Sequence, residues 1–156
     1  MTEPTLRTAH LFTLSALVDP NIVDLGETPL GRRRIANVTG GTFEGEELRG
    51  TILPAPGGDW LLLRRDGILQ LDVRLTLKTD DDHLIYMSYR GMRHGPAWVI
   101  EQLNKGEKVD PSQYYFRTTP VFETASDKYR FLNRIICVAT GRREAAGPVY
   151  DVFQVL

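Results

Sequence analysis

One ten-residue stretch of the chain alternates apolar and polar side chains without a break. From 69 to 78 the odd positions carry leucine or valine, and the even positions carry polar or charged groups. A period of two places every second side chain on the same face of an extended chain and does not fit a helix. Asp66-Gly67, shortly before it, favours a tight hairpin turn. The stretch therefore predicts an antiparallel strand with one apolar face.

Glycine, proline and aspartate divide the rest of the chain into short segments, and those between Gly40 and Trp60 suit the corners of a curved sheet. The other expected strands are 11–18, 32–39, 48–53, 60–64, 84–90, 114–124, 134–140 and 149–156. Segment 96–106 begins with proline and ends with glycine, which indicates a short helix, and 127–133 suits one helical turn. The pattern predicts an all-β protein, an antiparallel sandwich or barrel of roughly 8–10 strands with one or two short helices.

Composition narrows the setting of the protein. The 156 residues suit a single domain, 1–156, and the formal net charge of −1 argues against a nucleic-acid partner or an anionic membrane. The single cysteine, Cys137, lies in an apolar run and cannot form a disulfide within the chain. No N-terminal apolar segment and no run of about 18 apolar residues is present. We therefore expect a cytoplasmic protein.

Sequence motifs for several common chemistries are missing. The chain has no phosphate-binding loop, no Gly-x-Ser-x-Gly elbow and no dinucleotide fingerprint. Its three histidines, His10, His83 and His94, lack the spacing of metal ligands. We accordingly predict no metal and no cofactor.

A series of short motifs carries a family resemblance. In order they are Gly40-Gly41-Thr42-Phe43-Glu44-Gly45, Asp59-Trp60, Asp66-Gly67, Leu71-Asp72 with Arg74, Arg90-Gly91, Tyr115-Phe116-Arg117, and Tyr129 with Leu132-Asn133. In that order and spacing the chain resembles the DUF3237 family, also called UPF0311, whose members have no assigned function. The resemblance implies an antiparallel β-barrel similar to lipocalin-like barrels, often assembled as a homo-oligomer.

The orientation of the 69–78 strand decides where its polar side chains lie. Apolar faces usually pack on the core, which would place Asp72 and Arg74 outside. The resemblance points the other way, because this pair is among its marks. We predict that both line the barrel interior. The alternative is that Asp72–Arg74 and Glu123–Arg117 are structural ion pairs.

A small barrel has an interior that side chains fill or that holds one small ligand. The predicted catalytic residues are Asp72, Arg74 and Tyr115, and the predicted ligand-binding residues are Arg34, Asp59, Trp60, Arg117, Tyr129 and Asn133. Arginine binds a carboxylate or enolate, a partly buried aspartate moves a proton, and aromatic rings offer flat walls.

Together these groups predict a small-molecule-binding barrel, a cofactor-independent enzyme of isomerase, lyase or cyclase type. Its substrate would be a cyclic or aromatic compound with a carbonyl or carboxylate. The alternatives are a non-catalytic ligand-binding or carrier protein, and an assembling barrel whose interior is plugged. We also expect a homo-oligomer, because exposed sheet edges favour pairing.

Overall fold

Ten strands make up most of the protein, and the computed structural model describes residues 2–156. The strands are β1 (Thr8–Val18), β2 (Val23–Thr28), β3 (Gly31–Glu44), β4 (Arg49–Ile52), β5 (Gly58–Leu63), β6 (Leu69–Thr79), β7 (Leu84–His94), β8 (Tyr115–Glu123), β9 (Cys137–Glu144) and β10 (Gly147–Val155). One helix, α1 (Ala97–Asn104), and two 3₁₀ turns, Pro111–Gln113 and Arg130–Arg134, complete the elements. The expected helix and helical turn are thus confirmed.

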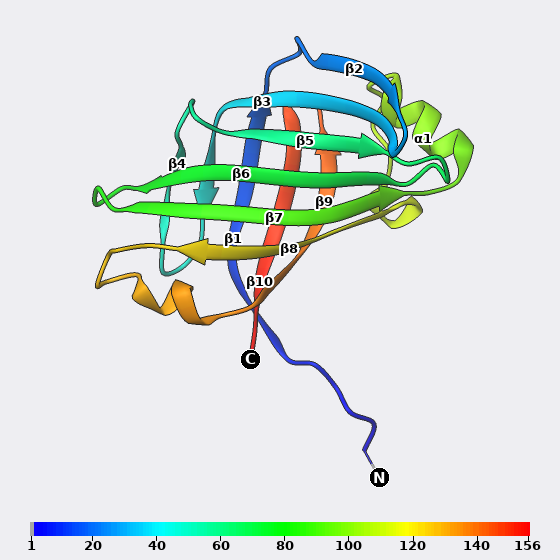
Figure 1. The fold of residues 1–156 in the computed structure, drawn as a ribbon. Helices are drawn as coiled ribbons and strands as arrows, with labels where there is room; N and C mark the ends of the chain where they lie inside the picture. Colours follow the sequence, from blue (N-terminus) through cyan, green and yellow to red (C-terminus); the bar gives the residue numbers. More distant parts are fainter. Residues whose placement is uncertain (1) are drawn as a thin grey trace.

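The sheet closes on itself and forms a barrel (Figure 1). Around the ring the order is β1, β10, β9, β8, β7, β6, then β4 and β5 in a shared position, then β3, which pairs with β1 again. Neighbouring strands are antiparallel throughout. The predicted antiparallel β-barrel is therefore confirmed, and closure removes almost every free strand edge.

The long strand β3 makes closure possible by changing partners along its length. Its first half pairs with β2 and β5, and its second half pairs with β1 and β4. The change occurs around Gly40 and Gly41, whose φ angles of 152° and 137° suit glycine. A side chain at Gly41 would also collide with the carbonyl oxygen of Ser15. These glycines form the expected corner.

Apolar side chains fill most of the barrel interior. On β6 the inward residues are Leu71, Val73, Leu75 and Leu77, all of them buried. Packing also crosses the barrel, because the rings of Phe12 on β1 and Phe122 on β8 lie 5.8 Å apart although these strands do not pair. Burial of this surface is the main force that holds the barrel together.

The prediction that Asp72 and Arg74 line the interior is wrong. Both alternate with the buried leucines and valines of β6, and Arg74 is exposed. They therefore lie on the outer face. Hydrophobic burial decides the orientation here, because enclosing the polar face would leave an apolar face in water.

The turns follow the sequence closely, with one exception. Gly67 has a φ of 85° in the β5–β6 hairpin, and Asp82 has a φ of 68° between β6 and β7. Strand β2 is the exception, because the sequence did not predict it. Its residues are mostly exposed, so it buries little apolar surface, and its pairing with β3 shifts between Asp24 and Gly26. Among residues 2–156 this strand pairs with β3 alone and lies outside the ring. Within residues 2–156, no helix is long and apolar enough to span a membrane.

Candidate functional site

A groove of about 820 Å³ crosses the outer face of the barrel from β5 to β10. This volume falls within the usual range of ligand sites, about 300–1,000 Å³. Its polar lining residues are Arg33, Gln70, Asp72, Arg90, Arg117, Thr118, Thr119 and Thr140, and its large apolar or aromatic ones are Trp60, Leu62, Leu71, Met92, Tyr115 and Phe153. The groove therefore combines flat apolar surface with charged groups, as sites for small molecules do.

Strand register brings the charged groups of the groove together. Asp72 on β6 pairs with Arg90 on β7, which pairs with Thr119 on β8. In the neighbouring row, Met92 pairs with Arg117. Directly paired residues share a face, with Cβ atoms about 4.5–5.5 Å apart. Residues far apart in the sequence thus form one patch on the outer face.

The charges of the groove are unbalanced. Arg33, Arg90 and Arg117 line it together with a single carboxylate, Asp72. Within residues 2–156, no salt bridge involves any of these four side chains. Two of the arginines are held by backbone carbonyls at 2.9 Å: Arg33 Nη1 donates to Trp60, and Arg117 Nη1 donates to its preceding residue. The groove therefore presents an excess of positive charge to a ligand.

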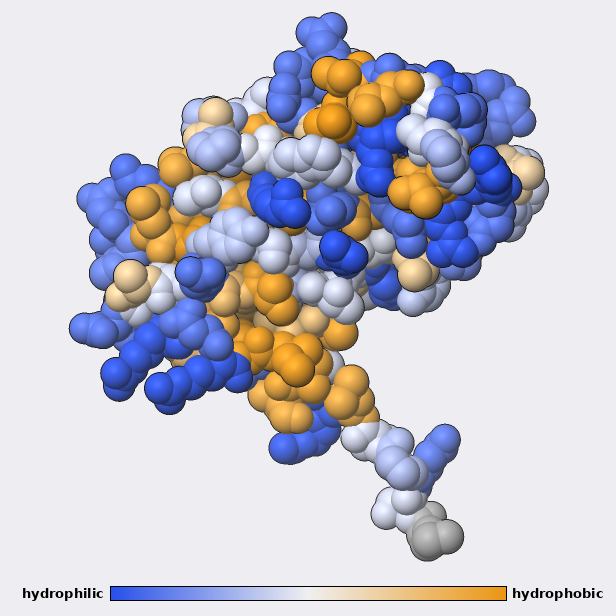
Figure 2. All heavy atoms as spheres, in the orientation of Figure 1, coloured by the Kyte–Doolittle hydropathy of each residue, from blue (hydrophilic) through white to orange (hydrophobic). Residues whose placement is uncertain are grey.

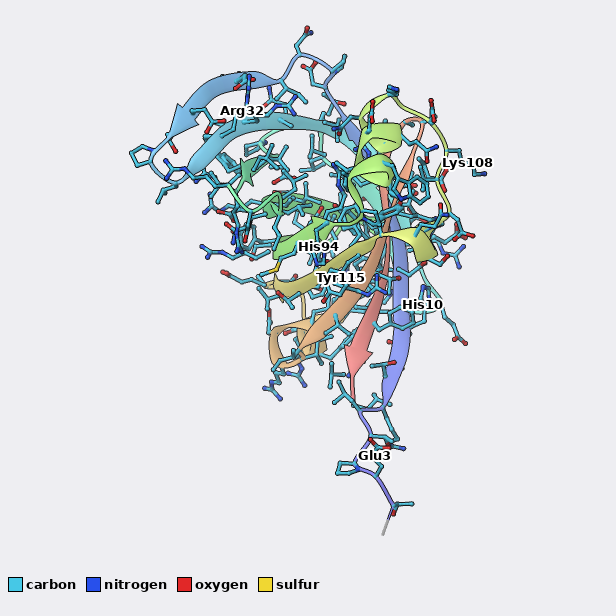
Figure 3. The ribbon with its side chains drawn as sticks, turned by 90° about the vertical axis from the view of Figure 1, so that its right-hand side faces the viewer. Glu3, His10, Arg32, His94, Lys108 and Tyr115 are labelled. Atoms are coloured by element: carbon cyan, nitrogen blue, oxygen red, sulfur yellow. The ribbon has the colours of Figure 1, made fainter. Side chains whose placement is uncertain are left out.

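Aromatic rings lie against Arg117 of the groove and against the neighbouring Arg74. Tyr115 stacks on His94 with ring centroids 4.9 Å apart, and the two side chains lie together in Figure 3. The guanidinium of Arg117 lies 5.3 Å from the centroid of Tyr115, and that of Arg74 lies 5.1 Å from Trp60. Such cation–π contacts hold the guanidinium groups against the rings without neutralising their charge.

The structure distributes the predicted site residues over several places. Trp60, Asp72, Tyr115 and Arg117 line the groove. Arg74 lies in an adjoining recess that Asp72 also lines.

The other four predicted residues lie elsewhere. Arg34 and Asp59 line a separate cavity inside one end of the barrel. Tyr129 is buried and donates its hydroxyl to Asp81 Oδ1 at 2.8 Å, while Asn133 bonds the backbone N–H and carbonyl of Thr124. These last two side chains hold loops in place and line neither cavity.

Sequence reasoning missed several groups at these two cavities. In the groove they are Arg33 and Arg90; in the end cavity, Arg93 and Tyr150. Arg93 has a detectable signal, because it continues the inward phase of an apolar strand and ends it with a charge. Arg90 belongs to one of the motifs that carry the family resemblance, which was its only signal. Arg33 has none, because arginine on an outward face is usually solvated.

The fold and the groove define the class: a small antiparallel β-barrel with a ligand-sized groove on its outer face. The family model described as "Protein of unknown function (DUF3237)" matches residues 6–155. A UPF0311 protein of Bradyrhizobium diazoefficiens is 39% identical over 153 residues, which cover 98% of this chain and 99% of that protein. The chain therefore belongs to the DUF3237 (UPF0311) family.

Solved structures of other proteins share the fold of this chain. A protein of unknown function from Rhodopseudomonas palustris has a TM-score of 0.91 at 36% identity and covers 99% of this chain and 100% of its own. A β-barrel-like protein from Acinetobacter baumannii has a TM-score of 0.85 at 38% identity over 99% of both chains. A protein described as an enzyme from Penicillium herquei shares the fold, with a TM-score of 0.74, at 18% identity over 100% of this chain and 99% of its own.

Proposed function

We propose that the outer groove binds a cyclic or aromatic small molecule that carries a carbonyl or carboxylate, and that the protein is a cofactor-independent enzyme. One observation carries this proposal: three arginines without carboxylate partners surround a single carboxylate on a concave, aromatic-lined face. Among residues 2–156 no other charged side chain lines the groove. An anionic ligand would supply the missing negative charge.

The groups of the groove divide into proposed roles. Arg90 and Arg117 bind the anionic part of the ligand, and Trp60 and Tyr115 hold its ring. Asp72 removes a proton from a carbon next to the carbonyl, and the bonding electrons move to the oxygen, where the arginines stabilise them. The resulting enolate can react in three ways. If it takes the proton back at another carbon, the protein is an isomerase; if it expels a leaving group, the protein is a lyase. If it attacks a second carbonyl of the same molecule, the protein is a cyclase.

The second candidate function is binding without turnover, as in a carrier or sensor. The openness of the groove favours it, because Tyr115 is 46% exposed and both Arg90 and Arg117 are exposed. A ligand bound there remains in contact with water, whereas enzymes that stabilise an enolate usually exclude it. The two functions share the same residues and differ only in whether the ligand is altered.

Native mass spectrometry of the freshly purified protein tests both functions. The compound that copurifies is identified, added back, and followed by liquid chromatography. For an enzyme, Asp72→Asn should abolish turnover and Arg117→Gln should raise KM, while Glu123→Gln, an exposed carboxylate on β8, should change neither. Full turnover by Asp72→Asn would exclude the acid/base role. A ligand recovered unchanged from the wild-type protein would favour the carrier.

A homo-oligomer is part of the proposal, and β2 supports it. This strand pairs with β3 alone, so its other edge is free among residues 2–156. Val23 and Leu25 in β2 and Leu30 just beyond it are 57%, 56% and 68% exposed, and apolar side chains gather at this end of the molecule in Figure 2. Pairing with a second copy would cover both edge and patch. Sedimentation velocity should show an oligomer that Leu25→Lys dissociates; a wild-type monomer at micromolar concentration would contradict it.

We also propose that the protein acts in the cytoplasm. The single thiol, Cys137, is buried and free, and burial raises its pKa to about 11. A free thiol of this kind suits a reducing compartment. Cell fractionation with an antibody against the protein checks the location.

A further inference from the structure

A second cavity, of about 400 Å³, lies inside the barrel at one end and is separate from the outer groove. Inward side chains of the sheet line it, among them Leu71, Phe116 and Tyr150. The end of α1, the segment after β1 and the turn between β9 and β10 also line it. Its volume is near the lower end of the range for ligand sites, about 300–1,000 Å³. The cavity can therefore hold a compact molecule.

Strand pairing points the side chain of Asp59 into this cavity. Asp59 pairs with Ala36 on β3 and Val73 on β6, and both of these are buried inward residues. Ala36 is small and leaves space beside the carboxylate. The strand pairing between β5 and β6 is interrupted after Asp59. At the interruption, the backbone N–H of Asp72 donates a hydrogen bond to the side-chain oxygen Oδ1 of Asp59 at 3.1 Å. The second carboxylate oxygen has no bonded partner within residues 2–156.

Two arginines in the cavity have unsatisfied donors. The Nε atoms of Arg34 and Arg93 are buried and have no hydrogen-bond partner within residues 2–156. Neither guanidinium takes part in an ion pair of the described chain. A buried charge without a partner is costly unless something compensates it. An anion in the cavity would compensate the charge of both guanidinium groups.

Phe116 and Tyr150 form an aromatic wall of the cavity. Their rings meet edge to face with centroids 5.4 Å apart, and the ring of Tyr89 meets that of Tyr150 in the same way at 5.1 Å. Burial raises the pKa of both phenols, so each stays neutral at pH 7 and keeps its proton. This wall suits the flat, apolar body of a ligand.

We propose that the end cavity is a second ligand site that binds a compact aromatic or cyclic carboxylate, with Arg34 and Arg93 holding the anion and Asp59 carrying a proton. The protonated carboxyl of Asp59 donates a hydrogen bond to the ligand. Ionised Asp59 would instead repel the anion. The site therefore binds its ligand and one proton together.

Proton uptake makes ligand affinity depend on pH. Burial is the main cause that raises the pKa of Asp59 to about 7, and the negative charge of Asp72 raises this pKa further. The hydrogen bond from the Asp72 N–H and the positive charge of Arg93 both lower it. The other titratable or charged groups on the elements around Asp59 are Arg34, Arg143, Tyr89, Tyr150 and Asp19. Since binding needs protonated Asp59, we expect affinity to fall about tenfold between about pH 6 and about pH 8.

Isothermal titration calorimetry with benzoate tests the site, and benzamide is the neutral control ligand. Arg93→Gln should weaken benzoate binding about tenfold or more, which corresponds to about 1.4 kcal/mol or more. Asp59→Asn should bind with an affinity that is the same at about pH 6 and about pH 8. Arg130→Gln, which replaces an exposed arginine that lines neither cavity, should change benzoate affinity less than about twofold. Circular dichroism and thermal unfolding show whether each variant is folded.

The outcomes separate this site from the outer groove. Benzoate binding that Arg93→Gln weakens and Arg130→Gln does not supports the end cavity, whatever happens to the proposed enzyme. Binding that only Arg117→Gln weakens would place benzoate in the outer groove and would overturn the proposal. No benzoate binding at millimolar concentration, or equal binding of benzamide, would overturn the proposal. If Asp59→Asn fails to fold, the proton uptake is measured on the wild-type protein in buffers of different ionisation enthalpy. Absence of proton uptake there would also overturn it.

Discussion

Replacing Asp59 with asparagine is expected to stabilise the protein, and to do so more at neutral than at acid pH. Burial raises the pKa of Asp59 from 3.8 to about 7. The folded protein therefore holds this proton more tightly than the unfolded chain does. The wild-type protein loses stability as the pH rises through this window, and the loss is complete above it. Asparagine has no charge at any pH, so the variant escapes the loss.

The magnitude follows from the width of that window. Each pH unit between the unfolded and folded pKa values changes the free energy of unfolding by about 1.4 kcal/mol. The window from about 4 to about 7 therefore sets an upper limit of about 4 kcal/mol. Asparagine keeps a side-chain oxygen that can accept the Asp72 N–H, so this hydrogen bond is retained. Because the carboxylate borders a cavity that water can enter, we expect a gain of about 2–4 kcal/mol at neutral pH.

Urea unfolding of both proteins from about pH 4 to about pH 8 measures this difference. The variant should match the wild-type protein at the acid end and exceed it progressively toward neutral pH. Glu123→Gln removes an exposed carboxylate and is the control for the loss of one negative charge. A stability difference that does not change with pH would refute the reasoning. So would an asparagine variant that is less stable than the wild-type protein at about pH 8.

Three other changes test the fold itself. Gly41→Ala should destabilise the barrel by more than about 2 kcal/mol, because the new methyl group meets the Ser15 carbonyl at a φ of 137°; normal stability in urea would contradict this. Tyr129→Phe removes the bond to Asp81 and should lower the free energy of unfolding by about 1 kcal/mol, which thermal denaturation would reveal as a lower Tm. Cys137, whose pKa burial raises to about 11, should react with a thiol reagent only after unfolding; immediate labelling of the folded protein would disagree.

The sequence was informative about strands and turns because these depend on local chemistry. Residues 69–78 form a strand because alternation fits only an extended chain, and Gly67 and Asp82 adopt the positive φ expected of turn residues. Strand β2 escaped detection because it lies outside the ring and buries little apolar surface. Its pairing depends on β3, and no local sequence pattern predicts that β3 is its partner.

The orientation of strand faces was harder to predict, and it decides where the sites lie. The alternation of apolar and polar residues places Leu71 and Asp72 on opposite faces of the strand. It does not predict which of the two faces lies inside the barrel. Family resemblance favoured the polar face, whereas burial of leucine and valine placed the apolar face inside. A polar outward face can still be a site when the sheet is concave there, and curvature of that kind depends on all the strands from β5 to β10.

The candidate residues themselves were partly predictable. Asp72, Tyr115 and Arg117 meet in the groove because the registers of β6, β7 and β8 align them, and Trp60 joins them from β5. Register depends on long-range pairing, so their proximity could only be a hypothesis from the sequence. Arg93 continues the inward phase of an apolar strand, and this signal could have identified it as a buried charge.

The two cavities are linked through the same pair of strands. Asp59 and Trp60 are consecutive on β5 and therefore point to opposite faces, one into the end cavity and the other into the groove. The backbone N–H of Asp72 bonds the Asp59 carboxylate, while the Asp72 side chain lines the groove. The charge of Asp72 also raises the pKa of Asp59. An anion bound beside Asp72 would raise that pKa further, so occupation of the groove would favour protonated Asp59 and the ligand that this form binds.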